Sequence, residues 1–297
     1  MLKCSYLVLL YGKKPSQSNT LETILSSQLR FDNCSITLWN NGPSSISNSL
    51  ECIPKLEGLG FVVEVVETLE NEAISKIYNE FISFRDSQKY VFLDDDSTLN
   101  DEYLSASLRL VDSEIGLPII RSGSCISSPR ENGIIRENIG LYEKEQEVMA
   151  IATGLVLGRN IIIEMLKKYN DVFDPRFYLY GVDTTFCFRI NALKLAHKTR
   201  TIEGFEHSLS RLVAESKEAS RFRRKERTYD TVLSSKFYFF PNNKLRHYKF
   251  MLRCALVYIY KIIFRKKQTI DILSLFRAIY SGKHYRDSEN KLIERIY

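Results

Sequence analysis

The stretch YVFLDDDS, residues 90–97, decides how the rest of the chain is interpreted. Its four apolar and aromatic residues predict a short buried strand, and three carboxylates follow at the carboxyl end of that strand. Open α/β sheets bind their ligands at this end. Three adjacent carboxylates raise each other's pKa unless a cation neutralises them. Asp94 and Asp96 are two residues apart, so in an extended segment both point toward one hard cation, such as Mg²⁺ or Mn²⁺.

The same acids also fit a simpler structure. The segment Asp96–Asn100 has the composition of a polar turn that caps a following helix, and an isolated run of three aspartates more often does only that. The apolar strand in front of the acids favours a metal and phosphate site instead.

Length and composition predict a folded protein. The chain has 297 residues, of which 44% are hydrophobic, 26% charged and 12% aromatic, enough for one large α/β domain with or without an appendage. No secretory leader is expected, because the first apolar run is short and lacks a small-residue cleavage site. The six cysteines have no metal-ligand spacing, so we expect reduced thiols in the cytosol; they are Cys4, Cys34, Cys52, Cys125, Cys187 and Cys254.

Four segments in the first hundred residues predict parallel strands that alternate with helices. The strands are expected at Ser5–Tyr11, Ser35–Trp39, Phe61–Val66 and Tyr90–Leu93, and helices at Ser18–Leu29 and from about Glu72 to Phe84. This half contains neither the glycine-rich dinucleotide fingerprint nor the P-loop motif. Any phosphate is therefore expected to bind through a metal at the aspartates.

The next hundred residues carry three further features. Residues 121–147 are polar and punctuated by glycine, which predicts a lid or substrate loop. Ile151–Leu157 predicts a strand whose small residues Thr153 and Gly154 let a ligand approach. The segment FYLYGVDTTFCFR, residues 177–189, places Asp183 at the start of a helix, where an aspartate is ordinarily only a cap.

Taken in order, these motifs resemble the inverting family 2 glycosyltransferases of GT-A fold. The order is a strand with Asp-x-Asp-Ser, a Thr-Gly strand, Gly-Val-Asp-x-x-x-Cys-x-Arg from Gly181, and Glu206-His207. The closest likeness is to the rhamnosyltransferase-like branch, which builds bacterial O-antigen, capsule and other surface polysaccharides. The resemblance covers roughly residues 4–210 and implies a mostly parallel sheet of GT-A type, flanked by helices.

The resemblance implies roles for five residues. Asp94 and Asp96 would hold Mg²⁺ or Mn²⁺ against the diphosphate of the donor, with Asp95 near the ribose. His207 would complete the metal or diphosphate site, although a lone histidine is more often structural. Asp183 would be the catalytic base, because inverting transfer needs a carboxylate to take the proton of the acceptor hydroxyl while the cation stabilises the leaving diphosphate.

Four more residues are expected around the nucleotide sugar. Asn40 lies where the family commonly has an aspartate that recognises the nucleobase. An asparagine keeps a hydrogen-bond acceptor at this position but loses the negative charge. Tyr11, Thr153 and Gly154 are expected to line the same site. Thr185 stands where relatives often carry a second acid, which leaves Asp183 as the one obvious base in its motif.

The resemblance divides the chain into a catalytic domain, residues 1–210, and a C-terminal extension, residues 211–297. Within the domain, residues 1–100 are the nucleotide-binding half and residues 101–210 the acceptor and catalytic half. The implied donor is dTDP-L-rhamnose or a UDP-hexose, and the implied acceptor is a free or polyprenyl-linked saccharide. The expected reaction is a metal-dependent single displacement with inversion.

The C-terminal extension is strongly basic. Residues 211–297 hold 21 Lys and Arg against 8 Asp and Glu, whereas residues 1–210 hold 21 against 28. This imbalance predicts an anionic partner for the extension. The apolar region at residues 248–264 contains three charges and is too short to cross a membrane comfortably.

Residues 245–267 predict a helix with two faces. Arg246, Lys249, Arg253 and Lys261 fall near one side, and the apolar side consists of Leu245, Tyr248, Leu252, Ala255, Ile259 and Ile262. An interfacial helix on an anionic membrane has this pattern, which predicts a peripheral protein on the inner face of the cytoplasmic membrane. The alternative is a helix packed on the catalytic domain with its charged side in water.

Two other classes of function stay open at this stage. The fold could serve as a GT-A-like scaffold without activity, although the retention of Asp94, Asp96 and Asp183 together argues against it. The second class is a nucleic-acid-binding protein that acts through the basic C-terminal region. Nucleic acid is not the expected partner, since the cations lie in one terminal third of the chain and no recognised binding module is visible.

Overall fold

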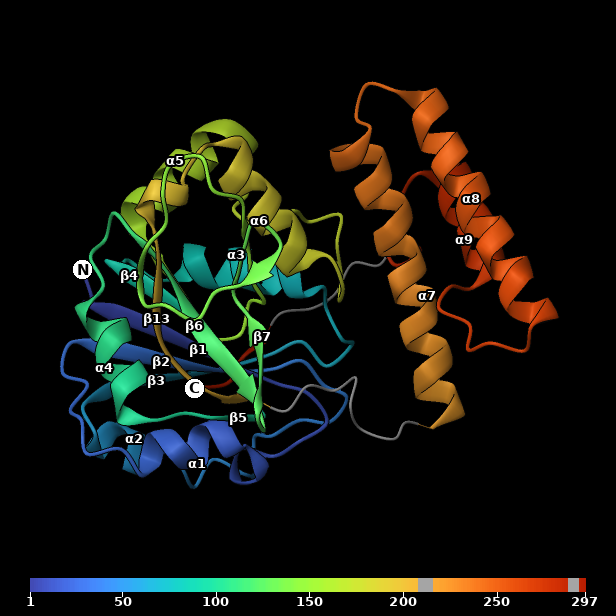
Figure 1. The fold of residues 1–297 in the computed structure, drawn as a ribbon. Helices are drawn as coiled ribbons and strands as arrows, with labels where there is room; N and C mark the ends of the chain where they lie inside the picture. The colour runs from blue at the N-terminus through green and yellow to red at the C-terminus, as the bar shows by residue number, and fades with distance from the viewer. Residues whose placement is uncertain (208–215, 288–293) are drawn as a thin grey trace.

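The computed structural model describes residues 1–207, 216–287 and 294–297 of the chain. Within these residues the protein has a large sheet of 11 strands and a small sheet of three. Figure 1 shows helices around the large sheet and three further helices, α7 to α9, standing beside it. This is the expected α/β fold with a helical C-terminal extension.

The large sheet has the strand order β10-β13-β6-β12-β4-β1-β2-β3-β14, with β5 paired to β13 and β7 paired to β6. Its strands are β1 (Cys4–Leu10), β2 (Cys34–Asn40), β3 (Phe61–Glu67), β4 (Lys89–Asp94), β5 (Ser97–Thr98), β6 (Ile115–Ser122), β7 (Cys125–Ser128), β10 (Gly140–Leu141), β12 (Leu155–Gly158), β13 (Thr199–His207) and β14 (Glu294–Arg295). The small sheet consists of β11 (Val148–Met149), β8 (Arg130–Glu131) and β9 (Ile134–Ile135).

Two apolar cores cover the two faces of the large sheet, because side chains alternate along each strand. In β1, Leu7 and Leu9 pack with α3, α5 and α6, whereas Tyr6 and Val8 pack with α1, α2 and α4. The helices are α1 (Asn19–Leu25), α2 (Ile53–Gly58), α3 (Ile74–Phe84), α4 (Asp101–Arg109), α5 (Arg159–Tyr169), α6 (Val182–Ala192), α7 (Lys217–Ser234), α8 (Lys244–Ile263) and α9 (Ile272–Ser281), with short helical turns η1 (Pro15–Gln17), η2 (Ala196–Lys198) and η4 (Ser235–Phe239).

The four strands predicted for the first hundred residues lie side by side and parallel, in the order β4-β1-β2-β3. Every residue of β1 and β2 is buried, as is typical of parallel strands covered on both faces. Because these strands run in one direction, their carboxyl ends meet at one edge of the sheet. Tyr11, Asn40 and the aspartates 94–96 all lie at that edge.

The strand expected at Ile151–Leu157 is shorter, and it runs antiparallel between β4 and β6. Gly154 has a φ of 78°, a conformation that residues with a side chain rarely adopt, and it turns the chain into β12. A Cβ at Gly154 would also lie 2.6 Å from atoms of Phe205 and Pro118. The glycine is therefore required by backbone conformation and by close packing.

Residues 121–147 do not form the open loop that the sequence predicts. β6 extends to Ser122 and turns back as β7, while β8, β9 and β11 form the small sheet. These added strands are two to four residues long, too short for an alternating pattern to be recognised in the sequence. A role as a lid or substrate segment stays a prediction.

The helices α7, α8 and α9 pack around a small apolar core of their own, formed by Tyr229, Val232, Met251, Leu275 and Ala278. In the described part of the chain, no helix is long and apolar enough to cross a membrane. The last residues return to the large sheet, where β14 pairs antiparallel with β3. The end of the chain thus departs from the expected division, which assigned all of residues 211–297 to the helical extension.

A buried polar cluster joins the helical extension to the sheet domain. Glu226 of α7 accepts a hydrogen bond from the Tyr285 hydroxyl at 2.6 Å and lies 3.4 Å from His284 Nε2. The His284 ring stacks on Tyr178 at a centroid distance of 4.2 Å. Arg286 donates to a backbone carbonyl of the segment before α3 at 3.1 Å. Glu226 is 2% exposed, so its charge depends on these partners.

Candidate active site

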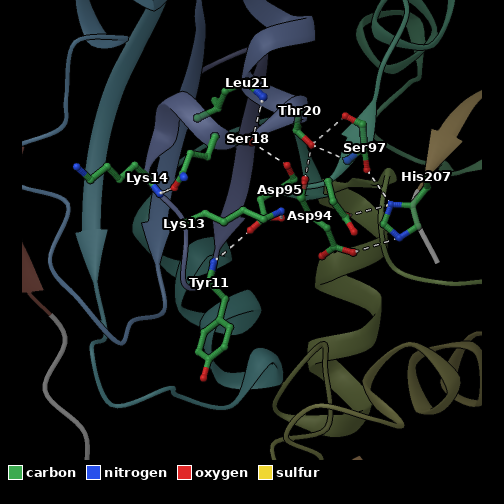
Figure 2. Close-up of polar contacts among 12 residues, drawn as sticks. Tyr11, Lys13, Lys14, Ser18, Thr20, Leu21, Asp94, Asp95, Ser97 and His207 are labelled. Atoms are coloured by element: carbon green, nitrogen blue, oxygen red, sulfur yellow. Dashed lines mark hydrogen bonds and ion pairs between the residues drawn. The ribbon is translucent and has the colours of Figure 1, made fainter. Parts of the chain in front are cut away.

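Asp94, Asp96 and His207 meet at the ends of β4 and β13. Asp94 ends β4, and His207 ends β13 opposite Ser97. His207 Nδ1 lies 3.3 Å from Asp96 Oδ1, and His207 Nε2 lies 3.9 Å from Asp94 Oδ2 (Figure 2). One ligand atom from each of the three residues lies within 4.8 Å of the others. A group with this spacing could hold a metal ion.

The electrostatics of this group favour a cation. Burial, followed by repulsion from Asp96 and Asp95, raises the pKa of Asp94 to about 7. Burial also raises the pKa of Asp96 and lowers the pKa of His207. A neutral imidazole offers a lone pair to a metal, and a cation would relieve the repulsion between the carboxylates. Two carboxylates fit a hard ion such as Mg²⁺ or Mn²⁺.

Asp95 points toward the loop after β1, as Figure 2 shows. Its carboxylate lies 2.6 Å from Lys13 Nζ and accepts a hydrogen bond from the backbone amide of Tyr11 at 3.3 Å. The Tyr11 side chain is 53% exposed and extends from the end of β1 beside these groups. Sequence reasoning missed Lys13, whose place in the exit loop of the first strand was its one available signal.

Thr153 and Gly154 lie behind the acids. Thr153 Oγ1 accepts a hydrogen bond from the Asp94 amide at 3.3 Å and lies 3.3 Å from Ser97 Oγ. Ser97 Oγ in turn lies 3.1 Å from His207 Nδ1. Thr153 and Gly154 are both buried, so Thr153 holds the acid-bearing turn in place. Contact of either residue with a nucleotide sugar stays a prediction.

Asn40 lies at the expected edge of the sheet but is 1% exposed. Its Nδ2 donates to the Ser44 carbonyl and to Glu67 Oε1, each at 2.8 Å, and its Oδ1 accepts from the Gly42 amide at 3.0 Å. Both amide protons are therefore used inside the protein. Asn40 therefore stabilises the turn after β2. Its contact with a nucleobase stays a prediction.

Asp183 is the second residue of α6, and the helix is capped by Gly181 with a φ of 80°. The aspartate is therefore not the cap that the simpler interpretation predicts. Its Oδ1 accepts a hydrogen bond from the Thr184 amide at 2.7 Å, and burial raises its pKa. Repulsion from Asp183 also contributes to the raised pKa of Asp94, so the two carboxylates lie close enough for their charges to interact.

Asp230 of α7 is an acid beside this site that sequence reasoning missed. Its Oδ1 lies only 2.2 Å from the point that a Cβ on Gly181 would occupy, so the carboxylate fills the space next to the cap of α6. Ser234 donates a hydrogen bond to the same oxygen at 3.0 Å. Burial, with a smaller contribution from Asp183, raises the pKa of Asp230 to about 6. No motif marks this residue, because it lies on a different helix.

The helix that carries Asp183 is anchored by Arg189 and Tyr238. Arg189 is 4% exposed, donates to the carbonyls of Asp171 and Val172 at 2.7 and 3.1 Å, and lies 3.4 Å from Asp174. Tyr238 of η4 donates to Asp174 at 2.7 Å and accepts from Arg189 at 3.2 Å. The arginine of the Cys-x-Arg motif is thus an anchor that also joins the helical extension to α6.

Comparison with known proteins places the fold. No family model and no curated protein matches the sequence. Among solved structures, S. aureus TarS is similar to this chain, with a TM-score of 0.53 and 14% identity. The match covers 88% of this chain and 44% of the TarS chain. Residues 1–349 of TarS in complex with UDP-GlcNAc match 78% of this chain and 65% of theirs, with a TM-score of 0.54 and 13% identity.

A mannosyltransferase, PcManGT from Pyrobaculum calidifontis in complex with GDP-Man and Mn²⁺, matches 77% of this chain and 62% of its own, with a TM-score of 0.50 and 13% identity. This chain therefore spans less than two thirds of the length of these matched chains. At such low identity the likeness shows the fold alone. The fold is the GT-A-like fold of nucleotide-sugar glycosyltransferases.

Proposed function

We propose that this protein transfers a sugar from a nucleoside-diphosphate donor to a saccharide acceptor, as an inverting glycosyltransferase of family 2. The observation that carries the proposal is the meeting of Asp94, Asp96 and His207 at the carboxyl end of β4, with Asp183 close by on α6. The GT-A-like fold and the nucleotide sugars bound by its structural neighbours support it.

The proposed metal site consists of Asp94, Asp96 and His207, with Mg²⁺ or Mn²⁺ as its ion. When bound, the ion supplies positive charge against the diphosphate that leaves the sugar. Lys13, now paired with Asp95, adds a second cation near the loop after β1. The exposed ring of Tyr11 lies next to these groups and is proposed to contact the nucleotide.

The proposed base is Asp183. The acceptor hydroxyl attacks the anomeric carbon and gives its proton to the Asp183 carboxylate, while the bond from the anomeric carbon to the diphosphate oxygen breaks. A raised pKa makes Asp183 a stronger base when it is ionised. Asp230 acts as a positioning residue, since its carboxylate packs on the cap of the helix that presents Asp183.

The proposed donor is dTDP-L-rhamnose or a UDP-hexose, and the proposed pathway is the synthesis of a bacterial surface polysaccharide such as O-antigen or capsule. The motif resemblance over roughly residues 4–210 supports this choice. The acceptor is proposed to be a free or polyprenyl-linked saccharide.

The test is a thermal-shift and hydrolysis screen of the purified chain against dTDP-, UDP- and GDP-sugars, with Mn²⁺ or with chelator. We expect one nucleotide class to stabilise the protein by about 2 to 3 kcal/mol at roughly a hundredfold excess over its Kd, and only with Mn²⁺. The double variant Asp94→Asn/Asp96→Asn should lose this response. Asp32→Asn, an exposed carboxylate, is the matched control and should keep it.

Stabilisation that is equal with chelator, or equal in the double variant, would show that the aspartates do not bind a metal with the donor. No response to any nucleotide in either condition would refute the transferase proposal.

A further inference from the structure

Helix α8 exposes a continuous apolar stripe. Its inner face buries Met251 in the small core with α7 and α9 and His247 beside Ser235 of η4, at 2% and 7% exposure. Its outer face carries large apolar side chains at intervals of three or four residues, so they line up along one side of the helix. Each is between 50% and 68% exposed; they are Leu245, Tyr248, Leu252, Leu256, Ile259 and Ile263.

The neighbouring helix α9 repeats this pattern. Leu273, Phe276 and Tyr280 lie at intervals of three and four residues and are 64%, 60% and 96% exposed. Ser274, Leu275 and Ala278 on the opposite side are buried. Figure 1 shows α8 and α9 on the side of α7 away from the sheet, so the sheet domain does not cover either stripe.

The charged residues from η4 to the end of the segment after α8 are all basic, and Asp271 at the N-cap of α9 is the first acid beyond them. Residues 231–270 contain nine Lys and Arg and no Asp or Glu. Arg246, Lys249 and Arg253 are exposed and follow one flank of the α8 stripe, and residues 265–267 add three exposed cations just beyond the helix. A second copy of this chain would bring like charges together and is disfavoured as the occupant. A nucleic acid would match the charge but leave the apolar stripe in water.

We propose that α8 and α9 form a docking surface for an anionic lipid bilayer, with both apolar stripes buried at the headgroup and acyl boundary and the cations on the phospholipid headgroups. Both helices lie along the membrane, since neither can cross it. The proposal goes beyond the proposed function, because it depends on the exposed faces of the extension and on no step of sugar transfer.

The apolar face expected from the sequence is wrong at Ala255, whereas Ile262 at its end is 53% exposed, as expected, beside Ile263. Ala255 is half-buried against the core of the helical extension, and Leu256 is exposed in its place. The sequence also allowed a helix packed on the catalytic domain. In the structure, α8 contacts mainly η4 and α9 instead.

The test is co-flotation of the full chain with vesicles of phosphatidylcholine, with or without phosphatidylglycerol. We expect the wild type to float with the anionic vesicles at low salt and to dissociate as salt rises. Leu252→Ser/Leu256→Ser/Ile259→Ser should bind at least roughly tenfold more weakly, since three apolar contacts are lost. Val111→Ser/Ile134→Ser, two exposed apolar residues of the sheet domain, is the matched control and should bind like the wild type.

Thermal melting must be unchanged in the triple variant, since its three side chains are already exposed. The proposal fails if the wild type does not bind anionic vesicles, if the triple variant binds as well as the wild type, or if an oligonucleotide binds and vesicles do not. It also fails if the wild type is a dimer in solution that the triple variant dissociates. Loss of donor binding in the screen above would leave vesicle binding unchanged.

Discussion

The acids at the end of β4 and the cations around α8 are both gatherings of like charge, but they are built differently. Burial of Asp94, together with repulsion from the nearby Asp96 and Asp95, raises the pKa of Asp94 to about 7. Thr153 and His207 contact the same turn. Four of the five cations of α8, Lys244, Arg246, Lys249 and Arg253, are exposed to water. A rigid acidic site fits a small cation, whereas a broad basic surface fits an extended anionic one.

The sheet that carries the acids and the helix α8 also differ in how many of their apolar side chains are buried. The central strands β1 and β2 are buried at every position, whereas α8 buries one face and exposes the other. The apolar share of β1 and β2 is close to that of α8, so apolar content alone does not predict which side chains are buried. Placement against other elements decides which apolar residues form a core and which form a surface.

The largest expected effect is on the acidic region. Asp183→Asn should lower the rate of sugar transfer by roughly 10²- to 10⁴-fold, because the amide cannot accept the proton of the acceptor hydroxyl. The Asn oxygen can still accept the hydrogen bond from the Thr184 amide, so folding should be preserved. Turnover is measured with the donor found in the screen, and donor-induced stabilisation is measured beside it.

Thr185→Ser serves as the control for this prediction, since its hydroxyl can keep the bond to the Gly181 carbonyl in the same turn of α6. A rate for Asp183→Asn within tenfold of the wild type would exclude Asp183 as the base. Loss of donor binding in Asp183→Asn would instead assign the aspartate to the donor site.

The next largest effect is on stability, and it tests whether the sheet domain and the helical extension unfold as one cooperative unit. Glu226→Gln should lower the free energy of unfolding by about 3 kcal/mol, because His284 and Arg286 lose their buried carboxylate partner. Urea denaturation measures the change. Glu218→Gln, an exposed acid on the same helix, should stay within about 0.5 kcal/mol of the wild type. Equal values for the two variants would show that the cluster does not hold the extension in place.

The smallest effect concerns Asp230, where α7 meets the catalytic helix. Its pKa is about 6 in the folded protein and lower in the unfolded chain, so the folded state binds the extra proton and stability falls as pH rises from about 4 to 6. Asp230→Asn should therefore raise the free energy of unfolding by about 2 kcal/mol near pH 7.5 and by little near pH 4.

Urea denaturation at both pH values measures this difference, and Asp32→Asn, which is exposed, is the control. If Asp230→Asn lowered the stability near pH 7.5, or changed it equally at both pH values, the charge of Asp230 would not be what destabilises the folded protein. A positioning role further predicts that Asp230→Asn shifts the pH profile of transfer while leaving donor binding unchanged.

The sequence was a good guide where its signals are local. The strands β1 to β4 were predicted within one or two residues, because each is a short apolar run followed by polar turn residues. The helix expected at Ser18–Leu29 ends at Leu25, since the chain leaves the helix at Ser26 and Ser27 binds Asp101 instead. The short strands within residues 121–147 were missed because each is stabilised by its pairing partner and not by a pattern of its own.

The sequence by itself determined the buried parallel strands, the run of aspartates at their carboxyl edge and the charge of the extension, because apolar runs, spacing and composition act over a few neighbouring residues. The tertiary structure alone decided that Ser97 meets His207 across 110 positions, that Asp230 packs beside Gly181, that Asn40 is buried and that α8 exposes its stripe. Contacts between distant segments depend on how whole elements pack, and no local pattern encodes them.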